Sequence, residues 1–385
     1  MLNLEKLWSL HHPVLPKHLK RLKKDLKDQL NSTLPGNQLS LTDYEQSIIN
    51  SIKAKTEQFN VNNLTRTQAY LSFYLNHTEI HWAFLGHMVS RNGGWNMTDL
   101  KGEFLPEILS AEERTHYFLF LERGNWLIFQ DAYPQFLIYE ESKKQQRPLF
   151  YLLPFFGVSI FMETVWKYFW NSFDNYSLAI AQVVNEQNYL EGRLIQNHHY
   201  QQTVLDTLEF QVQDLFKFNQ ILFPLPDQSG KQVKLIGQTL QHFASLRERV
   251  MLGKRLYELL FASESRLQRI TKWAESTPHS GSRKDYWNQL FHDIRENLPG
   301  NNLKRKIKNC QLINNSAKLY SPPLNYAWEN IFHTKADGKD WFEDPAIVHY
   351  LIRESYEVKG AVQHLYCENL EKIEMAAMAK KILFS

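Results

Sequence analysis

Apolar residues that recur every three or four positions constrain the fold of this chain more than any other feature. The first such stripe consists of Leu19, Leu22, Leu26 and Leu30. Comparable spacing continues through residues 64–90, 117–129, 159–173, 178–218, 240–273 and 357–383. Side chains spaced in this way line one face of an α-helix. Glycine and proline number only 15 and 14 among 385 residues, which argues against a β-sandwich with its many turns. No alternating run is long enough for a sheet, so the sequence predicts an all-α protein.

Capping residues mark several helix boundaries. Residues 42–45 and 110–113 form capping boxes of the type Ser/Thr-x-x-Glu. A break in the helical pattern is expected near Asn76. Gly93 and Gly94 predict a helix end, because glycine is favoured just beyond a helix C-terminus, and Thr98 would then cap the next helix.

A loop divides the predicted helical pattern. Residues 223–230 contain two prolines and a glycine, which makes them the clearest internal loop. We therefore expect a large irregular multi-helix domain, or two fused helical lobes. The boundaries would be 1–40 for a basic amphipathic N-terminal helix and its linker, 41–222 for the first lobe and 231–385 for the second.

The charge of the chain is mild overall but concentrated near its N-terminus. The net charge is +3, yet residues 17–27 carry six lysines and arginines. A solvated amphipathic helix is the ordinary interpretation of this segment. The alternatives are contact with an anionic membrane surface or an acidic partner. Nucleic acid is disfavoured, since the net charge is low and aromatic residues are not interleaved with the cations.

The compartment is inferred from what the sequence lacks. The longest apolar run, residues 149–162, is shorter than the roughly 20 residues a spanning helix needs, and Pro154 and Gly157 interrupt it. We expect a buried segment there and no transmembrane segment. No secretory signal is recognised at the start of the chain. The two cysteines, Cys310 and Cys367, are far apart in sequence, so reduced thiols and a cytoplasmic location are expected.

Two histidines raise the question of a metal site. His77 and His81 are four residues apart, which on a helix places both imidazoles on one face. The His-Glu-x-x-His zinc motif is absent, because Thr78 follows His77. A third ligand would have to come from far along the chain. We therefore predict no metal, keep His77 and His81 as weak candidates, and expect them to form hydrogen bonds or caps.

Arginines beside glycine-flanked turns suggest an anion site. In the first half of the chain the candidate ligand-binding residues are Arg66, Arg91, Asn92, Asn96 and Asp99. In the second half they are His279, Ser280, Ser282 and Arg283, in a turn that opens a helix. Guanidinium groups and free N–H groups at helix starts attract phosphates and carboxylates. The alternative is that these residues only cap helices, with Arg91 and Asn92 at a helix C-terminus.

A polar quartet, residues 185–188, lies inside an otherwise apolar helix. Such groups must be solvated, paired or functional. Glu186, like His81, is a candidate for proton transfer, and Glu191 lies nearby in sequence. The alternative is that the carboxylates pair with Arg66, Arg91 or Arg283.

Several strings of residues resemble one bacterial family. They are residues 65–70 (TRTQAY), 77–85 (HTEIHWAFL), 87–100 (HMVSRNGGWNMTDL), 278–287 (PHSGSRKDYW) and 366–374 (YCENLEKIE). Together they are similar to the YppC-like domain of unknown function 2515, an uncharacterised family of spore-forming Gram-positive bacteria. The resemblance runs from about residue 45 to the C-terminus; this chain has Thr78 where the family has proline, which a helix start tolerates. It implies a cytoplasmic bacterial protein and supplies no activity, cofactor or catalytic residue.

Three functions remain open from the residues. The first is a helical binding or scaffold protein with a polar pocket for a small anion or a protein partner. The second is a hydrolase acting on a phosphorylated or nucleotide-like substrate. The third is an adaptor that uses the basic N-terminal helix. The hydrolase hypothesis requires the first motif segment (residues 65–99), residues 185–191 and residues 279–283 to meet at one concave pocket. No cofactor is predicted.

Overall fold

The computed structural model describes residues 14–32, 41–206, 220–229, 232–240, 242–295, 304–313, 316–354 and 360–384. The helices before residue 150 are α2 (Lys17–Ser32), α3 (Asp43–Phe59), α4 (Asn63–Asn76), α5 (His81–Asp99), α6 (Leu105–Ile108) and α7 (Ala111–Gln145). The next group is η1 (Phe150–Phe156), α8 (Ile160–Ser172), α9 (Asn175–Leu190), η2 (Glu191–Ile195), α10 (His198–Tyr200) and η3 (Gln201–Leu205). The later helices are α12 (Leu246–Phe261), α13 (Glu264–Ser276), η4 (Arg283–Asp285), α14 (Leu324–Ala327), η5 (Pro345–Leu351) and α15 (Gln363–Phe384). The strands are β1 (Gln220–Pro226), β2 (Val233–Thr239), β3 (Phe291–His292), β4 (Ile307–Lys308), β5 (Gln311–Leu312) and β6 (Leu319–Tyr320).

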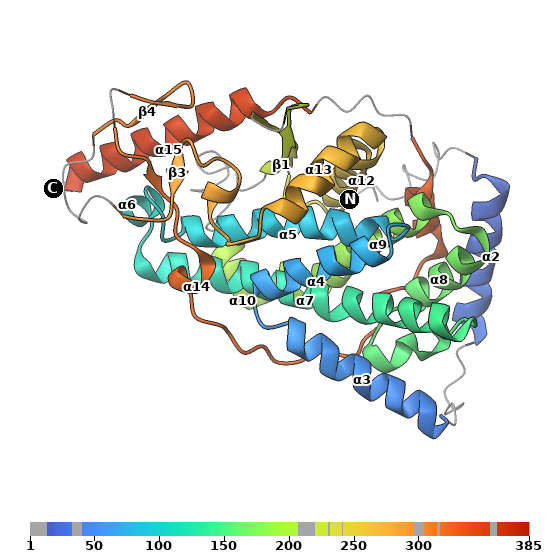
Figure 1. Cartoon of the computed structure of the whole chain (residues 1–385). Helices are drawn as coiled ribbons and strands as arrows, with labels where there is room; N and C mark the ends of the chain where they lie inside the picture. The colour runs from blue at the N-terminus through green and yellow to red at the C-terminus, as the bar shows by residue number, and fades with distance from the viewer. Residues whose placement is uncertain are drawn as a thin grey trace.

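Helices dominate the architecture, as the apolar spacing predicts. Helices α4, α5 and α7 run side by side through the middle of the molecule (Figure 1). Helices α2 and α8 lie at one end, and α15 lies with β3 and β4 at the other. Buried apolar residues form two clusters, and each draws on residues from both halves of the chain. The division into two lobes at residues 222 and 231 stays a prediction.

Local sequence signals account for many of the helix ends. Thr42 and Ser110 form the predicted capping boxes with Glu45 and Glu113. Helix α4 ends at Asn76, where the break was expected, and His77 is its C-cap. In the apolar stripe of α2, Leu19, Leu22 and Leu26 are buried and Leu30 is half-buried. The cations of α2 form no ion pair with any residue that the structure describes. The predicted linker after this helix, residues 33–40, lies outside the described residues.

The predicted helix end at Gly93 and Gly94 is wrong. Helix α5 continues to Asp99, so Thr98 lies in its last turn and does not cap a new helix. Gly94 is required for close packing. A Cβ atom on Gly94 would lie 2.4 Å from His279 Nε2 and 2.5 Å from Asn63 Oδ1. Glycine therefore lets α4 and the turn after α13 approach α5 closely, which outweighs its poor helix propensity.

Two further corrections concern the middle of the chain. Strands β1 and β2 form an antiparallel hairpin, and residues 223–226 of the predicted loop belong to β1. The two prolines of β1 are tolerated because a two-stranded sheet leaves N–H positions outside the ladder. The helix predicted over residues 240–273 is in fact two helices, α12 and α13, because Ser263 starts a new helix by accepting a bond from Arg266 N.

The two cysteines are joined. Cys310, beside β5, and Cys367, in α15, form a disulfide with their Cα atoms 5.2 Å apart. The expectation of two reduced thiols is therefore wrong: separation in sequence hid the proximity that the fold produces. The cytoplasmic location stays a prediction. Among the described residues, no helix combines the length and the apolar character needed to cross a membrane.

Candidate functional site

A cavity of about 240 Å³ lies between the central helices and the hairpin. Its wall comes mainly from three helices, each of which contributes positions i, i+3, i+4 and i+7. The positions are 82, 85, 86 and 89 on α5, 183, 186, 187 and 190 on α9, and 249, 252, 253 and 256 on α12. Helix α7, η2 and β1 close the remaining sides. Most of the lining side chains are aliphatic or aromatic, so the cavity is mainly apolar.

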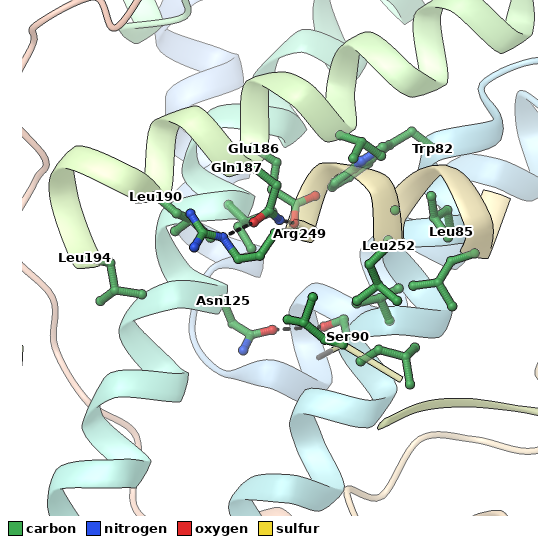
Figure 2. A pocket seen from close by; sticks show the side chains of 18 of the residues that line it. Trp82, Leu85, Ser90, Asn125, Glu186, Gln187, Leu190, Leu194, Arg249 and Leu252 are labelled. Atoms are coloured by element: carbon green, nitrogen blue, oxygen red, sulfur yellow. Dashed lines mark hydrogen bonds between the residues drawn. The ribbon is translucent and has the colours of Figure 1, made fainter. Parts of the chain in front are cut away.

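One end of the cavity is polar because of two neighbouring residues of α9. Glu186 and Gln187 lie beside Trp82 and Arg249 (Figure 2). The Gln187 amide donates to Glu186 Oε1 at 2.7 Å. Burial raises the pKa of Glu186 to about 7, although Gln187 and Trp82 stabilise its charged form. This carboxyl group therefore changes protonation near neutral pH.

The arginine at this end, Arg249, is bonded to other groups of the protein. Arg249 Nε donates to Gln187 Oε1 at 2.9 Å, and Nη1 donates to the Phe243 carbonyl at 2.6 Å. Its remaining nitrogen forms an ion pair with Glu191. Glu191 thus pairs with an arginine, as considered from the sequence, but the arginine is Arg249 and not Arg66, Arg91 or Arg283.

The opposite wall carries a second, smaller polar group. Ser90 and Asn125 lie together below the apolar part of the cavity in Figure 2, with Ser90 Oγ donating to Asn125 Oδ1 at 3.4 Å. Ser90 Oγ also lies 2.8 Å from Thr67 Oγ1. Asn63 donates to Ser90 Oγ at 3.0 Å from behind the wall. These contacts leave Ser90 well supported by protein partners.

Behind Ser90 lies a buried cluster that contains several of the predicted ligand-binding residues. His279 Nε2 is 2.8 Å from Asn63 Oδ1, and His279 Nδ1 is 3.7 Å from Asp285 Oδ2. Burial lowers the pKa of His279 to about 4, so the ring is neutral at pH 7. Arg91 donates to the Thr277 carbonyl at 2.7 Å and lies over the Trp273 ring at 4.4 Å. The amide of Asn63 therefore separates Ser90 from His279.

The other predicted arginines are also buried against carboxylates. Arg66 bonds Glu122 at 2.5 Å. Arg283 bonds Asp99 through Nε at 2.6 Å and stacks on Trp95 at 4.0 Å. None of the three predicted arginines lines the cavity.

The remaining predicted ligand-binding residues contact the protein itself. Asn92 forms two hydrogen bonds with the backbone of Leu222 in β1, at 2.9 and 2.8 Å. Ser280 donates to Asp285 Oδ1 at 2.7 Å, and Ser282 donates to the Ser321 carbonyl at 2.6 Å. Asn96 is buried, and its side-chain oxygen has no hydrogen-bond partner among the described residues. The anion-binding role of all these residues stays a prediction.

The two histidines considered for a metal do not converge. His81 Nδ1 lies 2.8 Å from the Tyr257 hydroxyl, and its ring stacks on Phe261. His77 lies 3.7 Å from Glu79 and 3.8 Å from Glu140. In the described part of the chain, no three His, Cys, Asp or Glu side chains are placed to hold a metal ion. Burial lowers the pKa of His81 to about 4.

Two of the three segments required by the hydrolase hypothesis meet at the cavity. They are the first motif segment, through Trp82 and Ser90, and the polar quartet, through Glu186. The turn at His279 reaches this wall only through Asn63. Sequence reasoning identified Glu186 but missed Tyr70, Asn125 and the α12 wall. One sequence feature could have indicated the α12 wall. It is Gly253, a small residue on a helix face that otherwise carries large side chains.

Comparisons with known proteins agree with the residue strings. The family model described as "Protein of unknown function (DUF2515)" matches residues 58–361. In Bacillus subtilis (strain 168), the protein named "Uncharacterized protein YppC" is 40% identical over 240 residues, which cover 62% of this chain and 73% of that protein. No solved structure matches the chain. Because the family model spans most of the sequence, this chain belongs to the DUF2515 family.

Proposed function

We propose that this protein binds a small, mainly apolar molecule in the cavity between α5, α9 and α12. The observation that carries the proposal is the cavity itself, about 240 Å³ in volume and lined mostly by apolar side chains. A mainly apolar ligand in this cavity would remove the aliphatic lining from water, and such burial is the main source of affinity in apolar pockets.

The size of the cavity sets the size of the ligand. A dry cavity of about 150 Å³ in another protein accommodates benzene. The larger volume here fits an aliphatic chain of about six to eight carbons with one polar end. Leu85, Leu190 and Leu252 would contact the chain, and the polar groups at either end would orient it.

The other candidate functions have weaker support in the geometry. An anion pocket needs cations that face the ligand, and none of Arg66, Arg91 and Arg283 lines the cavity. Each is bonded to an acceptor of the protein, although Nε and Nη2 of Arg91 have no hydrogen-bond partner among the described residues. A hydrolase needs a nucleophile in contact with a base. Asn63, whose amide cannot relay a proton as an imidazole does, lies between Ser90 and His279. Both functions stay predictions.

The test is binding of n-octanol to the purified full chain by isothermal titration calorimetry. Leu252→Phe places a larger ring in the cavity and should weaken binding about tenfold or more, because the ring occupies the ligand's volume. Val89→Phe fills the same space from α5 and should also weaken octanol binding about tenfold or more. Leu75→Phe, on the exposed side of α4, is the matched control and should bind as the wild type does.

Thermal unfolding supplies an independent check. Without ligand, the two cavity-filling variants should unfold at a higher temperature than the wild type. Octanol should raise the unfolding temperature of the wild type and of Leu75→Phe more than that of the two cavity-filling variants. Equal octanol affinity in the wild type and both variants, or no binding at all, would reject the cavity as the site.

A further inference from the structure

An unpaired carboxyl group lies at the polar end of the cavity. Glu186 has no Lys, Arg or His nitrogen within 4.0 Å among the described residues, and its hydrogen-bond donors are two neutral groups, the Gln187 amide and the Trp82 indole. Arg249, the cation on the same wall, is bonded to Glu191, Gln187 and Phe243. The protein thus provides a cavity-lining carboxyl group whose nearest cation, Arg249, is already bonded to other groups.

A second acceptor lies near this carboxyl group. Tyr70 and Trp82 both line the cavity, and Trp82 lies beside Glu186 (Figure 2). Burial and the charge of Glu186 both raise the pKa of Tyr70, so the two side chains are close enough to interact. The Tyr70 hydroxyl is buried and has no hydrogen-bond partner among the described residues, so it is a further acceptor at this end.

We propose that the ligand is a primary aliphatic amine whose ammonium group binds Glu186 and whose apolar chain fills the cavity. This inference rests on the proposed function and names the chemical class of its ligand. An ammonium group has three N–H donors, which match the Glu186 carboxylate and the Tyr70 hydroxyl oxygen. A carboxylate ligand would face Glu186 with like charge, and an alcohol would leave it without a counter-charge.

The binding of an amine should depend on pH. The groups that face Glu186 are Tyr70 from α4, Trp82 from α5, Asp131 from α7 and Arg249 from α12. Burial raises the pKa of Glu186 to about 7, so its charged form predominates only above that pH. The affinity for an amine should therefore be about tenfold higher at pH 8.5 than at pH 6, since a simple aliphatic amine stays protonated throughout.

The experiment compares n-octylamine, n-octanol and octanoate by calorimetry at pH 6 and pH 8.5. The wild type should bind octylamine at least about tenfold more tightly than octanol at pH 8.5, which corresponds to one buried charge-assisted contact. Glu186→Gln should reduce that preference to near zero and leave octanol binding intact. Glu275→Gln, an exposed glutamate on α13, is the matched control and should keep the preference.

The outcomes separate the two proposals. If octanol binds as tightly as octylamine, or if octanoate binds more tightly than octylamine, the ligand is not an amine. The cavity would then remain a binding site for apolar molecules. Failure of all three ligands to bind would reject the proposed function itself. The pH dependence of octylamine binding to the wild type tests the role of Glu186 without a variant. An octylamine affinity that is the same at pH 6 and pH 8.5 would also contradict the proposal of an amine ligand.

Discussion

At the scale of single residues, Gly94 determines how closely α5 meets its neighbours. The hydrogen bond between Asn63 and His279 passes over the place where a side chain at Gly94 would lie. At Gly93, the preceding residue, an added Cβ atom would lie 3.2 Å from Asn125 Nδ2, which is a less severe contact. Two adjacent glycines in one helix therefore have different roles.

Gly94→Ala should lower the free energy of unfolding by about 2–4 kcal/mol, because the new methyl group displaces His279 or Asn63 from a buried hydrogen bond. Gly93→Ala is the control. Its methyl group meets a movable amide, and alanine favours the helix by about 1 kcal/mol over glycine, so the net change should be small. Urea unfolding measures both. Equal effects of the two substitutions would contradict a special role for Gly94.

At the scale of elements, the connections between distant segments determine the shape around the cavity. The Asn92 side chain donates a hydrogen bond to the Leu222 carbonyl and accepts one from the Leu222 N–H. It thus takes the position that a further strand would have beside β1, and it attaches β1 to α5. The disulfide between Cys310 and Cys367 attaches the β4–β5 hairpin to α15. Each of these connections joins a strand segment to a helix that lies far from it in the sequence.

Reduction of the disulfide should destabilise the protein. The two cysteines are 57 positions apart in sequence, and closing a loop of that length stabilises a fold by about 4 kcal/mol in the chain-entropy model. The unfolding midpoint should fall on addition of reductant, and Cys310→Ser with Cys367→Ser should behave like the reduced protein. Thiol titration in denaturant should detect no free thiols before reduction and two afterwards. Two free thiols in the unreduced protein would contradict the pairing.

At the scale of the whole molecule, buried acids make stability depend on pH. Asp131 accepts hydrogen bonds from Gln135 at 2.8 Å and Asn185 at 2.5 Å, and this network links α7 to α9. Burial raises the pKa of Asp131 from 3.8 to about 7. Between these two values the folded state retains a proton that the unfolded state has lost. The contribution of Asp131 to stability is therefore complete below pH 3.8 and is lost as the pH rises to about 7.

Asp131→Asn should remove this pH dependence, because asparagine resembles the protonated acid. The free energy of unfolding of the variant, minus that of the wild type, should rise between pH 4 and pH 7 and level off above pH 7. Buried histidines such as His279 contribute equally to both proteins and cancel in the difference. Urea unfolding from pH 4.5 to pH 8 measures it. Asp28→Asn, on the exposed side of α2, should give a flat difference, and a flat difference for Asp131→Asn would contradict the assignment.

The sequence predicted the features that depend on neighbours along the chain. Apolar spacing identified the helices, and the capping boxes at Thr42 and Ser110 located two of their starts. The polar quartet pointed to Glu186, because a carboxyl group inside an apolar stretch is conspicuous without any structure. The hairpin was missed because the prolines of β1 are a local signal for a loop, and only pairing with β2 makes the segment a strand.

The sequence by itself determined the helical class, many helix boundaries, the family and one residue of the candidate site. Only the tertiary structure decided that Gly94 lies inside a helix, that Cys310 meets Cys367, and that Glu186 shares a cavity with Trp82 and Arg249. The physical reason is the range of the interactions. Helix periodicity and capping act over a few residues, whereas a cavity, a disulfide or a close helix crossing depends on segments brought together from distant parts of the chain.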